Sequence, residues 1–368
     1  MKRNSGFTLI ELLVAIGVTS VALAAAVMLF RDSTKANTNV TQASDMSDNM
    51  RAGLNLIVQD LVQTGTGVPT GGISIPNTVN AAGCNTGGKV NRPPAVLTLV
   101  FNGPNAANAG CNVILPAIEP GNALGPTVTS PDGTSGPPTD IITTLYSDNT
   151  LALDAKPING TGCPGGSLTA TGSSVTFDST CVVLGSAGIP VNPGDLLMIY
   201  NANNSNGILQ TVTSVSGQVL NFASGDAFNL NGRTTTETAG TIKQLQNAGG
   251  SYPNTSATRI WMITYYLDTT ADPKHPRLMR AVNFNAPQPV AETFENLQFT
   301  FNLVDGTTPP PVNQGTVPST DNENQIRSVN VYLGARTTNV AALSNQYTRT
   351  NLATQVALRS MAYFDTYK

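Results

Sequence analysis

The chain has 368 residues, of which only 11% are charged, and its formal net charge is −3. Glycine (34 residues) and proline (24 residues) are abundant, a composition that favours a turn-rich β protein over a cytosolic enzyme. There is no run of lysine or arginine to follow a phosphate backbone, so nucleic acid is excluded from the expected partners. The length allows one large domain or two after an N-terminal segment.

A long apolar segment lies near the start of the chain. It runs from Phe7 to Phe30 behind the basic residues Lys2 and Arg3, and Glu11 is its single ionisable side chain. A helix of this length spans about 36 Å, which is enough to cross the core of a bilayer. Because a carboxylate is costly in lipid, we interpret Glu11 as a functional residue that needs a partner.

The string Gly6-Phe7-Thr8-Leu9-Ile10-Glu11, followed by an apolar helix, resembles the prepilin signature of type IV pilins and type II secretion pseudopilins. The resemblance implies that prepilin peptidase cuts between Gly6 and Phe7 and that the new N-terminal Phe7 is methylated. It also implies that Glu11 is the assembly glutamate, that residues 1–6 are a cytoplasmic leader, and that other pilins are the partners in a filament. Pairing of Glu11 with the Phe7 amine of a staggered neighbour would relieve the cost of both charges.

Two other interpretations of the apolar segment stay open. A secretory signal peptide would use Ala22-Leu23-Ala24 as its cleavage site, but an early glutamate is unfavourable there and the helical pattern continues past Ala24. A plain single-span anchor would retain Met1. The prepilin interpretation instead places one span in the inner membrane, a periplasmic body beyond it, and later a filament.

We predict one continuous helix from Phe7 to about Gln63, ended by Thr64-Gly65-Thr66-Gly67. Its middle, residues 31–45, is rich in residues of poor helix propensity. A stripe with three- and four-residue spacing then predicts packing on a sheet, and it consists of Met46, Met50, Leu54, Ile57, Val58 and Leu61. The polar residues assigned to the opposite side are Arg51, Asn55, Gln59, Asp60 and Gln63.

The remaining sequence predicts an α+β fold in which the long helix packs on a mainly antiparallel β-sheet body. We divide the chain into the leader, the helix at residues 7–65, a loop-rich β region at 66–255 and an antiparallel block at 256–368. Pro116–Pro138 is predicted as a long loop, and Asn206-Gly207 and Ser216-Gly217 as hairpin turns. Strands are predicted at Ala95–Phe101, Cys111–Leu115, Asp140–Tyr146, Ser174–Leu184, Asp195–Tyr200, Ile208–Val215, Gln218–Phe222, Arg259–Leu267, Arg277–Phe284, Leu297–Leu303, Ile326–Ala335 and Thr354–Phe364.

All four cysteines, Cys84, Cys111, Cys163 and Cys181, follow the apolar segment. An even number in an exported chain favours disulfides over free thiols. Among the three connectivities we prefer the sequential one, because it closes the shortest loops. A metal site is the weaker alternative, since the spacings contain no C-x-x-C unit and His275 is the only histidine.

The sequence offers no convergent set of nucleophile, base and stabiliser. His275 lies in a predicted turn between Lys274 and Pro276, which is typical of an exposed loop. The acidic string Asp321-Asn322-Glu323 is a candidate for Ca²⁺, although it lacks the EF-hand pattern and a solvated loop is the simpler interpretation. We therefore expect a structural subunit and not an enzyme, with no catalytic residue, cofactor or metal.

The order of helix, β-rich body and antiparallel C-terminal block resembles the large minor pilins of the PilW type. It is also similar to the J-type minor pseudopilin of type II secretion. The string Asn49-Met50-Arg51-Ala52-Gly53-Leu54 and the final strands favour the PilW type, and the large body suggests a place near a filament tip. A tip adhesin is compatible with this hypothesis, whereas a periplasmic enzyme with a cleaved signal peptide is the alternative from another class.

Overall fold

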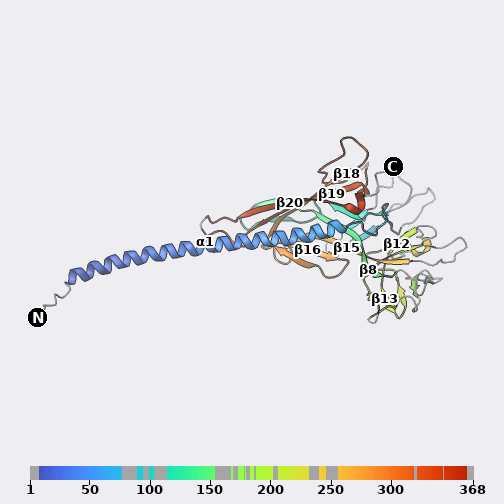
Figure 1. Cartoon of the computed structure of the whole chain (residues 1–368), viewed down its shortest axis with the longest axis horizontal. Helices are drawn as coiled ribbons and strands as arrows, with labels where there is room; N and C mark the ends of the chain where they lie inside the picture. Colours follow the sequence, from blue (N-terminus) through green and yellow to red (C-terminus); the bar gives the residue numbers. More distant parts are fainter. Residues whose placement is uncertain are drawn as a thin grey trace.

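The computed structural model describes residues 8–76, 89–93, 99–102, 114–153, 167–168, 173–177, 179, 183–185, 188–201, 206–231, 240–245, 256–318, 321–342 and 344–362. One long helix projects from a β-rich body, and the N-terminus lies at the far end of the helix (Figure 1). The predicted α+β architecture, a long apolar helix on mainly antiparallel sheets, is confirmed.

The helix α1 (Leu9–Gln63) has 55 residues and is therefore about 80 Å long. The turn that ends it contains Gly65 and Gly67, both with positive φ. A side chain at Gly67 would also clash with Ser147, because its Cβ would lie 2.1 Å from the Ser147 Oγ. Glycine is thus required where the chain leaves the helix and enters the body, as the sequence predicted.

The largest sheet of the described chain has nine strands, and β15 (Ser256–Asp268) is at its centre. One edge of β15 pairs with β8 (Ile141–Ala152), and the other pairs first with β11 (Leu196–Asn201) and then with β16 (Arg277–Val282). The outer strands of this main sheet are β17 (Gln288–Glu292), β12 (Asn206–Thr211), β1 (Ile73–Ser74), β4 (Ile114–Leu115) and β5 (Ile118–Gly121).

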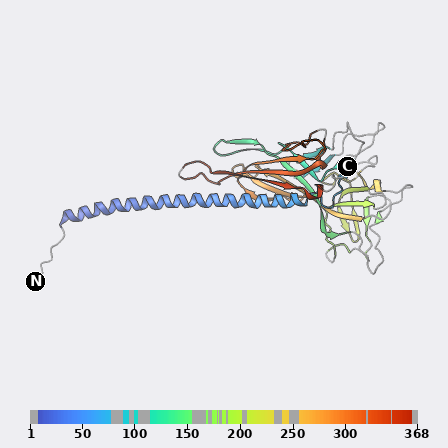
Figure 2. The same ribbon diagram turned by 45° about the horizontal axis from the view of Figure 1, so that its top comes forward.

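A second sheet consists of β18 (Phe294–Leu303), β19 (Ile326–Arg336) and β20 (Arg349–Ala357), all antiparallel. Its strands run lengthwise beside α1 in both views (Figure 1 and Figure 2). Two short helical turns lie near it, the 3-10 turn η3 (Glu323–Gln325) and α2 (Arg359–Ala362). The smaller elements are β13 (Ser214–Ser216), β14 (Val219–Asn221), β10 (Ser174–Thr176), β9 (Ser167–Leu168), the hairpin β2 (Lys89–Arg92) with β3 (Leu99–Asn102), the hairpin β6 (Thr127–Thr129) with β7 (Ser135–Pro138), and the 3-10 turn η2 (Ile242–Leu245).

Two main apolar cores lie on opposite faces of the main sheet. The larger joins the C-terminal half of α1, the main sheet and the β18–β20 sheet. The second joins the other face of β11 and β12 to the small sheet, with Leu197 and Ile208 on one side and Val175 and Leu220 on the other. Strands from both predicted regions, 66–255 and 256–368, take part in the main sheet, while the division into domains stays a prediction.

The buried stripe of α1 follows the prediction at Met46, Met50, Ile57 and Leu61, with Leu54 and Val58 partly buried. Gly53 also lies on the stripe, where a Cβ would come within 2.8 Å of Leu278. The placement of Asp60 on the polar side was wrong, because only 3% of that residue is exposed. Partners from the body surround its carboxylate, and helix periodicity carries no information about them.

Pro116–Pro138 is not one long loop, since it contains β5 and the hairpin β6–β7. β5 pairs with β8, and the hairpin is fixed to the β18–β20 sheet through Ser130 to Glu295 and Asp132 to Arg349. Prolines hid these strands because they are tolerated at strand ends and edges.

Other predicted boundaries also needed correction. Asn206-Gly207 is not a turn, because both residues pair with β11 as the start of β12. Ser216-Gly217 does enter a turn, with Gly217 at φ +57°. Within the described part of the predicted strand Ser174–Leu184, β10 is the one strand. The predicted strand Ile208–Val215 divides between β12 and β13, and the strand predicted at Thr354–Phe364 ends at Ala357, before α2.

Candidate assembly site

The first turn of α1 is closed by a reciprocal pair of side-chain caps. Thr8 is the N-cap, and its hydroxyl oxygen accepts a hydrogen bond from the Glu11 backbone N–H at 3.4 Å. The Glu11 carboxylate oxygen Oε2 accepts from the Thr8 backbone N–H at 3.0 Å and from the Thr8 hydroxyl at 2.9 Å. This capping box satisfies backbone donors that a helix start otherwise leaves without partners.

Only one carboxylate oxygen of Glu11 is used by the cap. None of the described residues donates a hydrogen bond to Oε1, and the Glu11 side chain is exposed. A carboxylate has lone pairs on both oxygens and accepts several hydrogen bonds. Glu11 can therefore cap its own helix and accept a further donor at the same time.

The N-terminal half of α1 makes no contact that buries it. The large apolar side chains from Leu9 to Phe30 are between 57% and 81% exposed. Within the described residues, α1 is the one helix long and apolar enough to cross a membrane, and none of its most apolar stretch is buried by the body. An apolar surface of this size requires lipid or other protein as its surroundings.

The C-terminal half of α1 is instead fixed to the body through Asp60. Arg280 on β16 donates to both carboxylate oxygens, at 2.8 and 3.1 Å. The hydroxyls of Tyr146 on β8 and Tyr265 on β15 donate to the same carboxylate, at 3.1 and 2.5 Å. Three neighbouring strands thus bind one helix side chain, and we call these four residues the Asp60 cluster.

The Asp60 cluster changes the acidity of its tyrosines. Burial raises the pKa of Tyr146 and Tyr265 above the ordinary tyrosine range, and the negative charge of Asp60 adds to the rise. Both hydroxyls therefore stay protonated and remain donors at neutral pH. The cluster therefore anchors the helix to the sheet, and neither of its tyrosines titrates near neutral pH.

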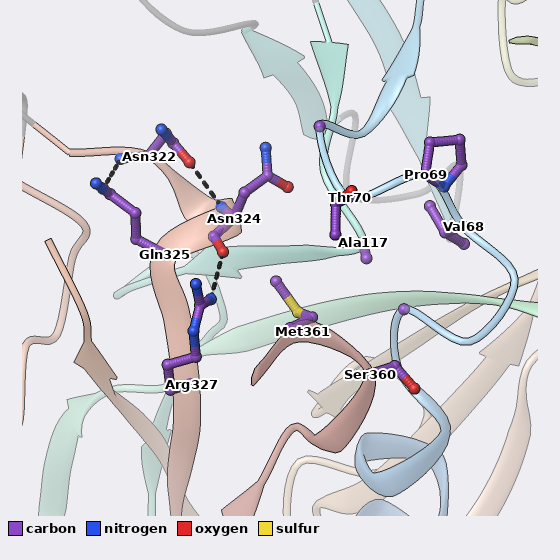
Figure 3. A pocket seen from close by; sticks show the side chains of 12 residues that line it. Val68, Pro69, Thr70, Ala117, Asn322, Asn324, Gln325, Arg327, Ser360 and Met361 are labelled. Atoms are coloured by element: carbon purple, nitrogen blue, oxygen red, sulfur yellow. Dashed lines mark hydrogen bonds between the residues drawn. The ribbon is translucent and has the colours of Figure 1, made fainter. Parts of the chain in front are cut away.

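A cavity of about 430 Å³ lies where α1 ends, between the turn after the helix, η3 and α2 (Figure 3). The polar residues that line this cavity form hydrogen bonds with one another. The Asn322 side-chain oxygen caps the Asn324 N–H at 2.9 Å, and Arg327 donates to the Asn324 carbonyl at 2.6 Å. Asn322, a member of the acidic string singled out in the sequence, therefore serves as the N-cap of η3.

Two acids, Glu323 of η3 and Glu119 of β5, lie close enough for the charge of Glu323 to add to the rise in the pKa of Glu119. Burial raises the pKa of Glu323, and burial also raises that of Glu119 on β5 to about 8, with Arg92 at 3.5 Å opposing the rise. The described part of the chain contains no group of three or more His, Cys, Asp or Glu residues that could hold a metal ion. The arrangement is that of buried acids beside a partner arginine.

Several predicted site residues lie outside the described residues: Gly6, Phe7, Cys84, Cys111, Cys163 and Cys181. Cleavage, methylation and disulfide pairing therefore remain predictions from the sequence. His275 lies in the predicted turn, where its Nδ1 is 2.7 Å from the Asp272 carboxylate and its side chain is 35% exposed.

Sequence reasoning missed the Asp60 cluster altogether. Asp60 was assigned to the polar side of the helix, and Tyr146, Tyr265 and Arg280 were assigned only to strands. The one available signal was an arginine within the predicted strand Arg277–Phe284, because a charged residue inside a buried strand requires a buried partner. The sequence alone did not connect that arginine to a carboxylate 220 positions earlier.

Residues 1–27 match the family model of the prokaryotic N-terminal methylation motif. The chain therefore carries a type IV prepilin-like signature at its N-terminus. Together with the exposed apolar helix, this signature supports a pilin-like or pseudopilin-like precursor. Neither the curated proteins nor the solved structures contain a significant match to the chain.

Proposed function

We propose that this chain is a minor type IV pilin of the PilW type, a structural subunit and not an enzyme. Prepilin peptidase removes residues 1–6, the new N-terminus at Phe7 is methylated, and the subunit waits in the inner membrane with its body in the periplasm. Assembly then transfers the apolar half of α1 from lipid into a filament core made with other pilins. The observation that carries this proposal is a methylation motif joined to a helix half whose apolar surface the body leaves uncovered.

Glu11 is the assembly residue in this proposal. Its Oε2 is held by Thr8, while Oε1 has no donor among the described residues. After cleavage the Phe7 amine of a neighbouring subunit supplies that donor as a cation. The pair neutralises two charges in apolar surroundings, where an isolated charge would be very costly.

The size of the body supports a position near the filament tip. All the sheets lie around the C-terminal part of α1, at the end opposite to the membrane segment (Figure 1). A subunit at the tip has neighbours on fewer sides, so a large body meets fewer clashes there. Labelled protein enriched at filament ends or in priming complexes supports this placement, and a uniform distribution along filaments contradicts it.

The proposal is tested by the mass and N-terminal residue of the protein from membranes, and by two Glu11 variants. We expect a mature chain that starts at N-methylated Phe7. Glu11→Gln and Glu11→Ala should be processed normally but largely lost from sheared filaments. Asp32→Asn is the matched control, because Asp32 is an exposed acid on the same helix beyond the apolar segment.

Four outcomes would contradict the proposal. A mature chain that starts near Ala25 indicates a secretory signal peptide, and retention of Met1 indicates a simple anchor. Normal incorporation of both Glu11 variants removes the assembly role of that carboxylate. A type II secretion pseudopilin shares the whole N-terminal chemistry, and incorporation into a secretion filament in place of a pilus would identify it.

A further inference from the structure

The strand β20 has an open edge. Two hydrogen bonds fix which of its groups face β19: the Thr337 N–H donates to the Thr348 carbonyl, and the Leu358 N–H donates to the Arg327 carbonyl. Because backbone direction alternates along an antiparallel pair, the even-numbered residues of β20 bond to β19. The odd-numbered residues direct their N–H and C=O groups outward, and their side chains are exposed: Arg349, Asn351, Ala353, Gln355 and Ala357.

The opposite edge of the same sheet is closed. Along β18, the Leu297 carbonyl accepts from the Asp140 N–H, and the Phe299 N–H donates to the Asp140 carboxylate. Further along, Phe301 exchanges two backbone hydrogen bonds with Gln314. Each outward position of β18 in this stretch therefore has a partner from elsewhere in the chain. Among the described residues, none pairs with the outward edge of β20.

Apart from Arg349 at its start, β20 lacks the usual protection of a free edge. Proteins blunt such edges with short strands, prolines, lysines or bulges. On the main sheet, β17 has five residues, contains Pro289 and has a register shift against β16, and β4 has two residues. β20 has nine residues, contains no proline or lysine, and pairs with β19 without a register shift.

We propose that the outward edge of β20 binds an extended strand of a neighbouring pilin subunit, so that the sheet continues from one subunit into the next. This inference rests on the proposed function, because β20 packs on α1 and a neighbour whose helix lies beside α1 brings its body to this edge. Leu352 and Val356 face the core, so an added strand with alternating apolar residues extends the covered face.

The added strand is not β20 of a second copy. It is a different strand of the neighbouring pilin subunit. β20 runs lengthwise beside α1 (Figure 1 and Figure 2). Antiparallel pairing of two β20 strands would reverse one helix relative to the other, whereas subunits from one membrane have parallel helices. A heterologous contact of this kind joins two different surfaces and extends along a filament.

The direct test is photocrosslinking of the full chain in cells that assemble filaments. A benzoylphenylalanine at Ala353 should give an adduct in the filament fraction that maps to a strand of another pilin subunit. Benzoylphenylalanine in place of Gln288, which is exposed on the protected strand β17, is the control and should give no adduct. No adduct at Ala353, an adduct with β20 of a second copy, or an adduct with a protein that is not a pilin would each overturn the inference.

A proline scan tests the hydrogen bonds themselves. Ala353→Pro removes one outward N–H and leaves the bonds to β19 intact. In this variant the benzoylphenylalanine is placed at Asn351 instead, and the yield of its adduct should fall by about tenfold or more. Ala353→Ser keeps the N–H and should retain the crosslink. If Ala353→Pro does not accumulate in membranes, Gln355→Pro makes the same test. Undiminished crosslinking in filaments that contain a folded proline variant contradicts the inference and leaves the proposed function untouched, because processing at Phe7 is measured separately.

Discussion

The two halves of α1 face different surroundings although they form one continuous helix. From Leu9 to Phe30 the side chains are apolar on all sides and exposed. From Met46 to Gln63 one face is buried in the body and the other is polar. The first half lacks a selective face, which is typical of a segment surrounded by lipid or by other helices. The second half has one partner, its own domain.

This difference indicates where sequence changes will act. A change on the buried face of the C-terminal half alters the stability of the isolated subunit, because that face packs on the body of the same chain. A change in the N-terminal half alters insertion or assembly and leaves the body folded. Pairs of matched variants, one from each half, separate these two effects.

The largest effect is expected when the anchor of the second half is removed. Asp60→Ala leaves Arg280 without its carboxylate, and breaking a buried ion pair costs about 3–5 kcal/mol. Denaturation of the full chain in detergent, followed by the signal of Trp261, measures the loss. Asp45→Ala, at an exposed acid of the same helix, should change the free energy of unfolding by less than about 0.5 kcal/mol. Equal effects of the two variants would show that the Asp60 cluster is not an anchor.

Each half of α1 contains one glycine, and the same substitution at both positions compares the packing of the two halves directly. Gly53→Val places a side chain against Leu278 and Phe294, where Cβ contacts of 2.8 and 3.4 Å leave no room, and overpacking costs about 1–3 kcal/mol. Gly17→Val meets nothing within 4 Å in the subunit. We expect the first variant to lower the denaturation midpoint and the second to leave it unchanged. A destabilised Gly17→Val subunit would mean that the body contacts the N-terminal half.

The stability of the body should also depend on pH. The pKa of Glu119 rises from 4.5 when unfolded to about 8 when folded. The folded state therefore binds more protons between these values, and this contribution to stability is complete below about pH 4.5 and is lost as pH rises towards 8. The slope is at most about 1.4 kcal/mol per pH unit.

Denaturation at several pH values between 5 and 8 measures this dependence, relative to two variants. Glu119→Gln should reduce the loss of stability, because its amide does not titrate. Glu292→Gln, at an exposed glutamate of β17, should follow the parent protein. If the stability of the parent protein does not fall more steeply with rising pH than that of Glu119→Gln, the raised pKa of Glu119 is refuted.

The smallest effect is expected at the helix start. Thr8→Ala removes the N-cap hydroxyl, and loss of a cap costs about 1 kcal/mol of local helix stability. Hydrogen exchange in detergent should become faster in the first turn alone. Thr34→Ala removes a hydroxyl that bonds only to the Phe30 carbonyl, so exchange in the first turn should not change. Faster exchange throughout the body in Thr8→Ala would contradict a local role.

The sequence predicted the helix well because every signal for it is local. The apolar segment, the stripe from Met46 to Leu61 and the glycines after Thr64 each act within a few residues of chain. The strand β15 was also predicted, because its residues are apolar on both faces and it lies at the centre of the main sheet.

The missing parts of the prediction all depend on distant partners. Asp60 is buried because Tyr146, Tyr265 and Arg280 surround it, and pattern analysis treats any helical aspartate as exposed. The strand β17 was missed because Pro289 marks it as a loop, although a proline is tolerated at a sheet edge. Long-range pairing determines such elements, and a single sequence does not display that pairing.

The Asp60 cluster also determines how a pulling force on the helix reaches the body. In the proposed function, extraction of the subunit from the membrane pulls on the N-terminal end of α1, and the helix transmits this force along an axis of about 80 Å. At the other end, Asp60 passes the load to β8, β15 and β16 through Tyr146, Tyr265 and Arg280. These strands are hydrogen-bonded to one another at β15, so the pull acts on them together. The pulling force is therefore shared by the three strands, so the body moves with the helix as one unit and its strands do not separate from the helix one at a time.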